Sequence, residues 1–373
     1  MTFVSLILIF IGKKFNLSDR MLIKESLNQD SFKGVVALIR RICKYTFILE
    51  TLGAVILAIR FIPQYGIKTG IFYSIFHSIS AFCNAGFDIL GDSSFMNYSS
   101  DLLVNIAIMM LIIIGGLGFT VWTDILNTLK KGIKEKLNIK KIWKSFSLHT
   151  KLVLTITIIL LVTGTLSIYL LEYNSTLMKN DNQGTKILKA AFQATTLRTA
   201  GFSTINQNEL TTAGKFISIC YMFVGGSPTS TAGGIKTTTL AILILYIVNF
   251  ISGKNEITVF KKSISFEVVR RAVFIFIISV FVVTIAVFGL LVSENSLTFT
   301  LLDVFFEVVS AFGTVGLSLG ITNKLTVVGK IIISLLMIIG RLGPITITIA
   351  LFKNKKEKNE NSALHPQGNV LVG

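Results

Sequence analysis

The stretch SAFGTVGLSL, residues 310–319, follows a short apolar run and turns around a single central glycine. Two similar stretches occur upstream, SAFCNAGFDI at 80–89 and ATTLRTAGFST at 194–204. Their central glycines are Gly86, Gly201 and Gly316, each 115 residues from the next. Self-similarity at a fixed period indicates a duplicated structural unit. We therefore expect a repeated unit with one such loop in each copy.

The composition is that of a membrane protein. Of 373 residues, 52% are hydrophobic and 15% are charged, with a mean hydropathy of +0.72, whereas soluble domains carry about a quarter of charged residues. The net charge of +17 would suggest a nucleic-acid partner in a soluble protein, but the basic residues gather between apolar spans, as at 130–144 and 261–271. Because cytoplasmic loops carry such an excess, we expect a multi-pass protein of the cell membrane and no nucleic-acid partner.

Cysteine and histidine give no sign of a metal or cofactor site. Cys43, Cys83 and Cys220 form no spaced set, and the three histidines are scattered. A disulfide framework or a zinc site would show regular spacings. We therefore expect no resident cofactor in this chain.

Six apolar segments are long enough to cross about 30 Å of hydrocarbon, which takes about 20 residues. They lie near 45–62, 102–123, 152–171, 216–250, 272–293 and 331–352. Shorter apolar runs lie between paired spans, at 70–82, 186–196 and 297–311. Runs of that length are typical of re-entrant segments, and each precedes one of the repeated glycines. The predicted unit is therefore a span, a re-entrant helix with its loop, and a second span.

A second landmark follows each loop and supports the repeat. The three copies are GGLGFT (115–120), GGSPTST (225–231) and GRLGPIT (340–346). We predict an all-α integral membrane fold of helix–pore-loop–helix units around a pseudo-fourfold pore. The second repeat is expected at 45–123, the third, with a broken gate helix, at 152–250, and the fourth at 272–352. Cytoplasmic segments are expected at 13–44, 124–151 and 251–271, and a C-terminal tail at 353–373.

The first residues resemble the end of a span. MTFVSLILIF matches the stretch that follows GGLGF in the next unit, so residues 1–12 are expected to end the second helix of a first repeat. A further copy upstream would place its glycine before Met1. We therefore expect three full units and the tail of a fourth, with the first repeat missing through truncation or a misassigned start codon.

The loop after each re-entrant helix suits a cation. The C-terminal end of a helix carries a partial negative charge of about half a unit, and the residues beyond it can turn backbone carbonyls toward a central axis, where they replace a hydration shell. Glycine tolerates the backbone angles that such close approach requires. For one loop alone a simple turn explains the glycine equally well, but three copies in register favour an ion filter.

Acidic residues near the first of these loops are expected to favour cations modestly. Asp88, Asp92 and Asp101 flank it, and no lysine or arginine lies between 88 and 101. Their effect is small because exposed charges are screened within about 10 Å.

A polar run interrupts the span at 216–250. It reads GGSPTSTAGGIKTTT (225–239), and proline and paired glycines break helices. A simple kink is the alternative, but a kink needs one proline rather than a long polar run. We interpret the run as an intramembrane loop that can obstruct a pore. The predicted gate residues are Gly225, Gly226, Ser227, Pro228, Thr229, Ser230, Thr231, Ala232, Gly233, Gly234 and Lys236.

Arg341 is centred in the apolar segment 331–352. A buried arginine costs at least ~2.5 kcal/mol at mid-membrane, so we expect it to face water or a partner. As a functional group, it would be a fixed positive charge below the filter that lowers cation occupancy. As a structural group, it would pair with Glu307 or with backbone carbonyls.

These motifs resemble those of the Ktr/Trk/HKT superfamily of potassium transporters, most closely the KtrB type of membrane subunit. The matching stretches are HSISAFCNAGFD (77–88), TLRTAGFST (196–204), GGSPTSTAGGIKTTT (225–239), FEVVSAFGTVGLS (306–318) and GRLGP (340–344), with further likeness at LIKESLNQDS (22–31) and HPQGNVLVG (365–373). The resemblance implies a single-glycine K⁺ filter, with 225–239 as its gate and Arg341 as the pore arginine. The implied filter residues, which would bind K⁺ through backbone carbonyls, are Asn84, Ala85, Gly86, Thr199, Ala200, Gly201, Thr314, Val315 and Gly316.

The resemblance also implies partners. Family members work as homodimers in the lipid bilayer on a cytosolic RCK-type regulatory subunit, KtrA-like, which binds ATP or ADP. A nucleotide is therefore expected only on that partner, and uptake in such proteins is often stimulated by Na⁺.

Three alternatives remain open at this point. One is a Trk-type potassium or cation symporter subunit. Another is a secondary transporter of a different solute, whose broken helices would form a midplane site, although three loops in parallel register do not suit it. The third is an intramembrane enzyme, which would need a nucleophile with histidine or paired carboxylates. Only Glu50 and Glu307 lie within apolar runs, which argues against an enzyme.

Overall fold

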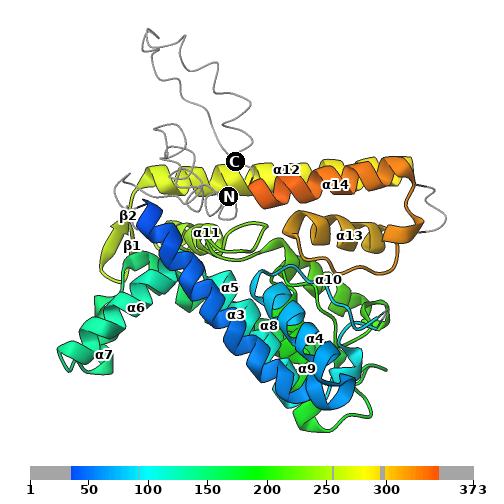
Figure 1. Ribbon diagram of the computed structural model, residues 1–373. Helices are drawn as coiled ribbons and strands as arrows, with labels where there is room; N and C mark the ends of the chain where they lie inside the picture. Colours follow the sequence, from blue (N-terminus) through cyan, green and yellow to red (C-terminus); the bar gives the residue numbers. More distant parts are fainter. Residues whose placement is uncertain (1–34, 92, 254–255, 295–298, 344–373) are drawn as a thin grey trace, which may run out of the picture.

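A computed structural model describes residues 35–91, 93–253, 256–294 and 299–343. Within them, three consecutive helical units are joined by connecting segments (Figure 1). The expectations for residues 1–12, for the tail at 353–373 and for most of the linker at 13–44 lie outside the described residues.

Each unit has a long outer helix, a short middle helix and an inner helix. The first unit comprises α3 (Val35–Tyr65), α4 (Ile67–Phe82), the 3-10 turn η1 (Met96–Tyr98) and α5 (Leu102–Leu117). The second comprises α8 (Leu148–Glu172), α9 (Gln183–Thr196), η2 (Gln207–Glu209) and α10 (Thr212–Phe223), and continues after a loop as α11 (Thr237–Ile251). The third comprises α12 (Phe266–Ser293), α13 (Leu301–Gly313), η3 (Thr322–Lys324) and α14 (Val327–Leu342).

The connections between units carry structure of their own. After α5, the chain forms α6 (Phe119–Lys134) and α7 (Ile139–Ser145). After α11, it forms a hairpin of β1 (Ile257–Val259) and β2 (Lys262–Ile264), in which Ile257 lies opposite Ile264. The segment expected as a cytoplasmic loop at 124–151 thus contains most of α6, all of α7 and the start of α8. The segment expected at 251–271 contains the hairpin and the start of α12.

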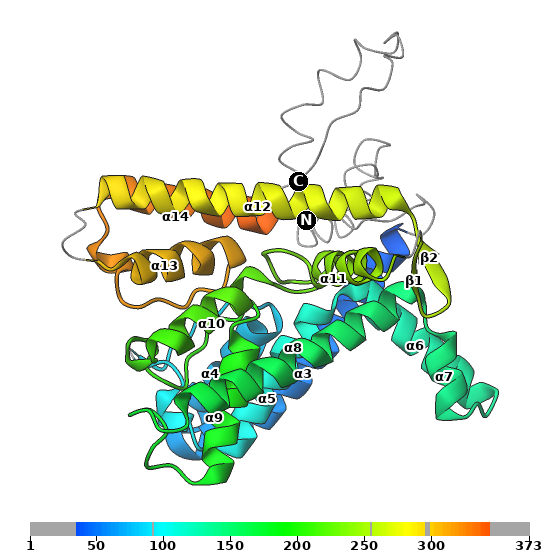
Figure 2. The same cartoon turned by 180° about the vertical axis from the view of Figure 1, so that it is seen from behind.

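The units pack in sequence around a common centre. Within a unit the outer helix packs against the middle and inner helices, as α12 does against α13 and α14 in Figures 1 and 2. Between units, the inner helix packs on the middle helix of the next unit, α5 on α9 and α10 on α13. The repeated contact places the ends of α4, α9 and α13 toward one another.

The span lengths differ from expectation at the inner helices. Arg40–Tyr65, Leu148–Glu172 and Phe266–Ser293 are long and apolar enough to cross a membrane. The expectation of one continuous span over 102–123 is wrong, because α5 ends at Leu117 and α6 leaves at 97°. Gly118 lies at the break with a φ of 92°, a left-handed conformation that glycine adopts without steric cost. Gly343, with a φ of 84°, ends α14 in the same way.

The inner helices α10 and α14 begin with the same contact. Thr211 and Thr326 cap them, each accepting from a backbone amide in the first turn. A buried carboxylate from the outer helix side accepts from the threonine: Glu172 from the amide (3.0 Å) and hydroxyl (2.7 Å) of Thr211, Glu294 from the amide (3.1 Å) and hydroxyl (2.7 Å) of Thr326. A negative charge is favoured at a helix N-terminus, so these contacts fix the inner helices on the outer ones.

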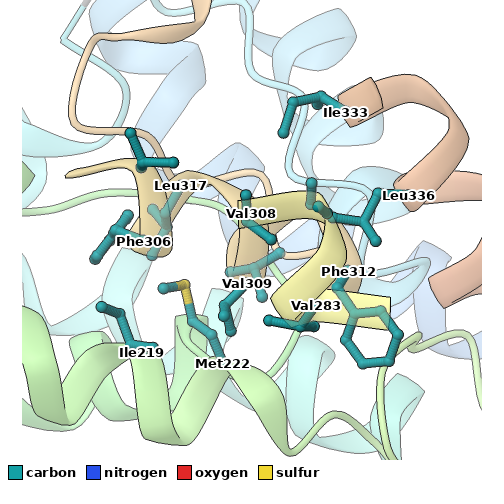
Figure 3. Packing of buried hydrophobic residues seen from close by; sticks show 14 of the residues in the cluster. Ile219, Met222, Val283, Phe306, Val308, Val309, Phe312, Leu317, Ile333 and Leu336 are labelled. Carbon is teal, nitrogen blue, oxygen red and sulfur yellow. The ribbon is translucent and has the colours of Figure 1, made fainter. Parts of the chain in front are cut away.

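The middle helix of the third unit lies inside a hydrophobic cluster, shown in Figure 3. Phe306, Val309 and Phe312 of α13 are buried among residues of α10, α12 and α14, including Met222 and Val283. Leu317, beyond the end of α13, belongs to the same cluster. The loop that follows α13 is therefore held on a packed base.

The outer helices expose apolar side chains along one face. On α12 the exposed residues recur every three or four positions: Phe274, Ile277, Phe281, Ile285, Phe288 and Val292. On α8 they are Ile158, Val162, Leu166 and Leu170. Exposed apolar surface of this extent marks contact with a membrane or another protein, and long apolar helices make lipid the fitting neighbour.

Candidate functional site

The three predicted filter loops share one backbone pattern. Two positions in each loop, separated by one residue, have positive φ. The first positions are Asn84 (48°), Thr199 (71°) and Thr314 (54°), and the second are Gly86 (72°), Gly201 (92°) and Gly316 (87°). Positive φ is uncommon for residues other than glycine. Its recurrence at Asn84, Thr199 and Thr314 therefore indicates that the three loops share one constrained backbone conformation.

The structure brings the three glycines into contact. A Cβ atom placed on Gly86 would lie 3.0 Å from the Cα of Gly201, and one on Gly201 would lie 3.3 Å from the Cα of Gly86. A Cβ on Gly316 would lie 3.9 Å from the Cα of Gly201. Loops that are 115 residues apart in sequence therefore meet at one point, with Gly201 between the other two.

Backbone carbonyls line this meeting point. A Cβ on Gly86 would lie 2.2 Å from the carbonyl oxygen of Ala200, and one on Gly201 would lie 2.3 Å from that of Val315. The residue before a glycine thus presents its carbonyl oxygen to the glycine of the preceding loop. Oxygens placed in this way can replace the hydration shell of a cation. Any side chain at position 86 or 201 would collide with them.

A hydroxyl group at the end of each middle helix clamps the loop, a feature that the sequence analysis missed. It donates to the carbonyl oxygen of the residue after the glycine: Ser80 to Phe87 (2.7 Å), Thr196 to Phe202 (2.6 Å) and Ser310 to Leu317 (2.6 Å). The backbone carbonyl of each hydroxyl-bearing residue accepts from the amide of the residue before the glycine: Ser80 from Ala85 (2.9 Å), Thr196 from Ala200 (3.0 Å) and Ser310 from Val315 (2.8 Å). A serine or threonine six or seven residues before the clamped carbonyl was the available signal.

The predicted gate loop, residues 225–236, is closed at its neck. The Gly225 amide donates to the Ile235 carbonyl oxygen (2.9 Å), and the Ile235 amide to that of Phe223 (3.3 Å). The break between α10 and α11 confirms that the span expected at 216–250 is interrupted. It is a closed loop rather than a kink.

The gate loop lies directly against the filter loops. A Cβ on Gly225 would lie 3.2 Å from Cγ2 of Thr199, and one on Gly233 would lie 2.3 Å from Oγ1 of Thr314. Only a residue without a side chain fits either position. The paired glycines, read from sequence as helix breakers, thus also allow the loop to approach the filter.

The gate loop is also tied to its neighbours on both sides. Toward the first unit, the Thr231 hydroxyl lies 3.2 Å from the Phe82 carbonyl oxygen and 3.1 Å from that of Gly115. Toward the third unit, the Gly234 amide donates to the Gly340 carbonyl oxygen (3.3 Å). The loop therefore spans the space between the break after α5 and the end of α14.

Two cationic side chains, one from α14 and one from the loop itself, bond to backbone carbonyls of this loop. The exposed Arg341 donates from Nη1 to the Thr231 carbonyl oxygen, and Lys236 donates to the Ala232 carbonyl oxygen (2.8 Å). The sequence offered two structural partners for Arg341. The pairing with Glu307 is wrong, because Glu307 accepts from the hydroxyls of Ser318 and Thr322, beyond Gly316. The backbone carbonyl is the partner found.

The acidic residues near the first filter loop differ in their roles. Asp101 caps α5 through the Val104 amide and pairs with Arg60 at 2.6 Å. Its charge is therefore compensated, and the expectation that it favours cations is corrected. Asp88 is half-buried, and Asp92 lies outside the described residues. Arg198, the residue before Thr199, is buried, and its Nε has no hydrogen-bond partner among the described residues.

Histidine, cysteine and acidic side chains do not gather into a metal site in the part of the chain that the structure describes. No group of three or more histidine, cysteine, aspartate or glutamate residues is placed to hold a metal there. The candidate cation site therefore rests on the backbone carbonyls at the meeting point of the loops.

Comparisons with known proteins agree with this arrangement. The family model described as TrkH, cation transport protein, matches residues 1–362. The chain is 37% identical over 381 residues to the Ktr system potassium uptake protein B of Bacillus subtilis, covering 100% of this chain and 80% of that relative. It is 37% identical over 362 residues to the potassium/sodium uptake protein NtpJ of Enterococcus hirae, covering 97% and 77%.

A solved structure shows the same fold. The crystal structure of the potassium transporter TrkH from Vibrio parahaemolyticus matches with a TM-score of 0.68, covering 89% of this chain and 68% of that one. The sequence identity is 20%, so this likeness concerns the fold alone. It confirms the predicted all-α membrane fold.

Proposed function

The chain belongs to the TrkH family of cation transport proteins, and from that premise we propose that it is the pore-forming membrane subunit of a potassium uptake system. Its family and its relatives are transport proteins, so this chain is an integral membrane transporter and not an enzyme. K⁺ is the proposed transported ion, with Na⁺ as a further transported or coupling ion, because the relatives are a potassium and a potassium/sodium uptake protein.

The observation that carries the proposal is the contact of three equivalent loops through their glycines. A carbonyl oxygen faces the meeting point from Ala200 and from Val315. Carbonyl dipoles that are held in place compensate a cation for lost water without a charged side chain. The clamp from each middle helix holds them, so the geometry is built before an ion arrives.

The gate loop and Arg341 are proposed to control passage below this point. The loop lies against Thr199 and Thr314, and the Arg341 guanidinium is bonded to it. A cation that leaves the filter would meet both the loop and a fixed positive charge. Displacement of the loop would release the Thr231 bonds and take the obstruction away. The closed neck at Gly225 and Ile235 makes the loop a unit that can move as one piece.

The filter proposal is tested by ion competition in proteoliposomes. With an outward K⁺ gradient and no Na⁺ or proton gradient, rubidium uptake should be inhibited more strongly by external K⁺ than by Na⁺. Gly316→Ser should reduce this preference: its Cβ would have room, with the nearest atom at 3.9 Å, but a φ of 87° strains any side-chain-bearing residue. Gly289→Ser is the matched control, because a Cβ there meets only Ile332 Cδ1, at 3.4 Å.

Two results would contradict the filter proposal. One is a wild-type protein in which Na⁺ competes as well as K⁺. The other is a Gly316→Ser variant with unchanged competition. Uptake that occurs only with an imposed Na⁺ or proton gradient would instead indicate the symporter alternative.

The gate proposal is tested by freeing the loop. Deletion of residues 227–234 should raise rubidium uptake at equal expression. Thr231→Ala is the milder variant: it removes a shared hydrogen bond worth about 1 kcal/mol, which should favour the open state about fivefold. Thr238→Ala, which removes a half-buried hydroxyl of α11 near the loop, is the control. Equal or lower uptake in both gate variants would refute the gate.

The partners follow from the relatives' names as proposals. The Bacillus subtilis relative is one protein of a Ktr system, so this chain is proposed to work with a separate regulatory subunit. A cytosolic RCK-type subunit that binds ATP or ADP, and a homodimer of this chain, are the proposed assembly. Co-purification with that subunit and the mass of the detergent-solubilised complex test them.

A further inference from the structure

Residues 119–145 form α6 and α7, an arm whose first two residues bond to the gate loop at Thr229: the Phe119 amide donates to its carbonyl oxygen (3.2 Å), and the Thr120 and Thr229 hydroxyls lie 3.0 Å apart. The proposed transport function does not use the rest of the arm. The arm leaves the membrane helix α5 at 97°, and Figures 1 and 2 show α6 and α7 projecting from the helical body on the side of the β hairpin. A helix at nearly a right angle to a span runs along a bilayer rather than through it. The lysine-rich composition places this side in the cytoplasm.

An apolar stripe runs along the arm. It consists of Leu129, Ile133, Ile139 and Trp143, whose exposed fractions are 40%, 79%, 81% and 38%. Each helix contributes one pair four residues apart, which places the two members on the same face. Exposed isoleucines at these levels are unfavourable in water, at about 25 cal/mol per Å² of apolar surface.

Lysines surround the stripe without acidic partners. The exposed lysines of the arm are Lys130, Lys131, Lys134, Lys136, Lys140, Lys141 and Lys144. None of them forms a salt bridge with the described residues. The arm has two acidic residues, and the Asp124 carboxylate already accepts from the Ser147 amide (3.0 Å) and the Thr150 hydroxyl (2.5 Å).

We propose that the α6–α7 arm binds anionic phospholipid headgroups at the cytoplasmic surface of the bilayer, with its apolar stripe inserted among the acyl chains. An apolar face flanked by lysines is the pattern of helices that lie in the interface, and tryptophan prefers that depth. A soluble acidic protein could meet the lysines. The direct departure of the arm from a membrane span, however, places the stripe beside lipid.

The test uses Trp143 as a reporter in the whole protein. The chain has two tryptophans, so Trp122→Phe leaves Trp143 alone. In nanodiscs, acyl-brominated phosphatidylglycerol should quench Trp143 fluorescence more strongly than brominated phosphatidylcholine at the same mole fraction. K140Q/K141Q/K144Q should reduce the difference, because each lysine near an anionic surface favours the lipid about fivefold and four exposed lysines remain on the arm.

A matched triple variant distinguishes the effect of lysines on the arm from the effect of the protein's net charge on quenching. K179Q/K324Q/K330Q removes three exposed lysines away from the arm, one between α8 and α9, one in η3 and one in the first turn of α14. This variant should keep the difference in quenching between the two lipids. Equal quenching by both lipids in the Trp122→Phe protein would overturn the proposal, and so would a preference that K140Q/K141Q/K144Q leaves undiminished. Absence of quenching by either lipid would also overturn it and would leave a soluble partner as the occupant. Monodisperse elution of each variant confirms folding.

Discussion

Ser310 is bonded to both sides of Gly316, the proposed filter glycine of the third unit. Its hydroxyl donates to the Leu317 carbonyl oxygen (2.6 Å), and its own carbonyl accepts from the Val315 amide (2.8 Å). Leu317 is 4% exposed, so its carbonyl has little access to water in place of the hydroxyl. The side chain and the backbone of Ser310 therefore hold the chain on both sides of Gly316.

Ser310→Ala should loosen the filter more than it destabilises the fold. A buried acceptor left without its donor costs about 1–3 kcal/mol, and the loop can recover part of this by shifting. We expect a smaller preference for K⁺ over Na⁺ in rubidium competition. Ser334→Ala is the control, since its hydroxyl also donates to a carbonyl, that of Lys330 (2.8 Å), but on an exposed face of α14. Equal effects of the two variants would argue against the clamp.

At this scale the sequence predicted the glycines but not what holds them. Gly86, Gly201 and Gly316 stand out through their even spacing. The clamping hydroxyls are hidden, because Thr196 is six residues from its acceptor whereas Ser80 and Ser310 are seven. Partner choice was equally hidden. Glu307 was a reasonable partner for Arg341 by charge, yet hydroxyl groups of its own loop satisfy it.

The start of α14 depends on one glycine for its cap. A Cβ on Gly329 would lie 2.2 Å from Oε1 of Glu294, the atom that accepts from the Thr326 hydroxyl (2.7 Å). The same holds for Gly214 and Glu172 at the start of α10, where the distance would be 2.0 Å. These glycines are a third repeated feature, 115 residues apart.

Gly329→Ala should destabilise the protein, because the carboxylate must move away from the helix N-terminus. Overpacking of this kind costs about 1–3 kcal/mol, which should appear as a lower melting temperature of the detergent-solubilised protein. In α12, Gly289→Ala should be neutral or stabilising, because a helical alanine gains up to ~1 kcal/mol over glycine. Glu294→Ser should reduce the penalty in the double variant, since the shorter side chain leaves the space. A Gly329→Ala melting temperature equal to wild type would contradict this account.

Element boundaries were predicted unevenly. The middle helices expected at 70–82 and 186–196 are observed as α4 and α9, each extended by three residues at its N-terminus. Hydropathy misjudged the inner helices because apolar residues continue past the break: the segment at 102–123 stays hydrophobic beyond Gly118. The second landmark contained the signal, since Gly118 and Gly343 end α5 and α14 at corresponding places.

For the whole molecule, the repeat was the most informative feature of the sequence. Even spacing of the loops predicted that they meet, and the meeting follows because each inner helix packs on the next middle helix. Contacts that depend on tertiary packing could not be predicted. The gate loop approaches Thr199 and Thr314 and bonds to Gly115 and Gly340. These contacts join residues that lie far apart in the sequence, with no local pattern between them.

The membrane position of the molecule makes a prediction that depends on depth. Phe281 lies near the middle of α12 with 64% of its side chain exposed, and Phe266 begins the same helix with 71% exposed. Phe281→Lys should lose about 2.5–3.5 kcal/mol, the cost of a charge at the centre of a spanning helix. Phe266→Lys should cost little, because a lysine at a helix end extends its amine to the interface.

The measurement is the amount of monodisperse protein extracted from the membrane fraction at equal synthesis. A soluble protein would tolerate both lysines, since both positions are exposed, and a lysine that faces solvent rarely changes stability by more than about 0.5 kcal/mol. If the yield of monodisperse protein falls for Phe281→Lys and is kept for Phe266→Lys, hydrocarbon must surround the middle of α12 and polar groups its start. Equal yields for the two variants would show that the exposed face of α12 does not contact lipid, because depth alone separates the two positions.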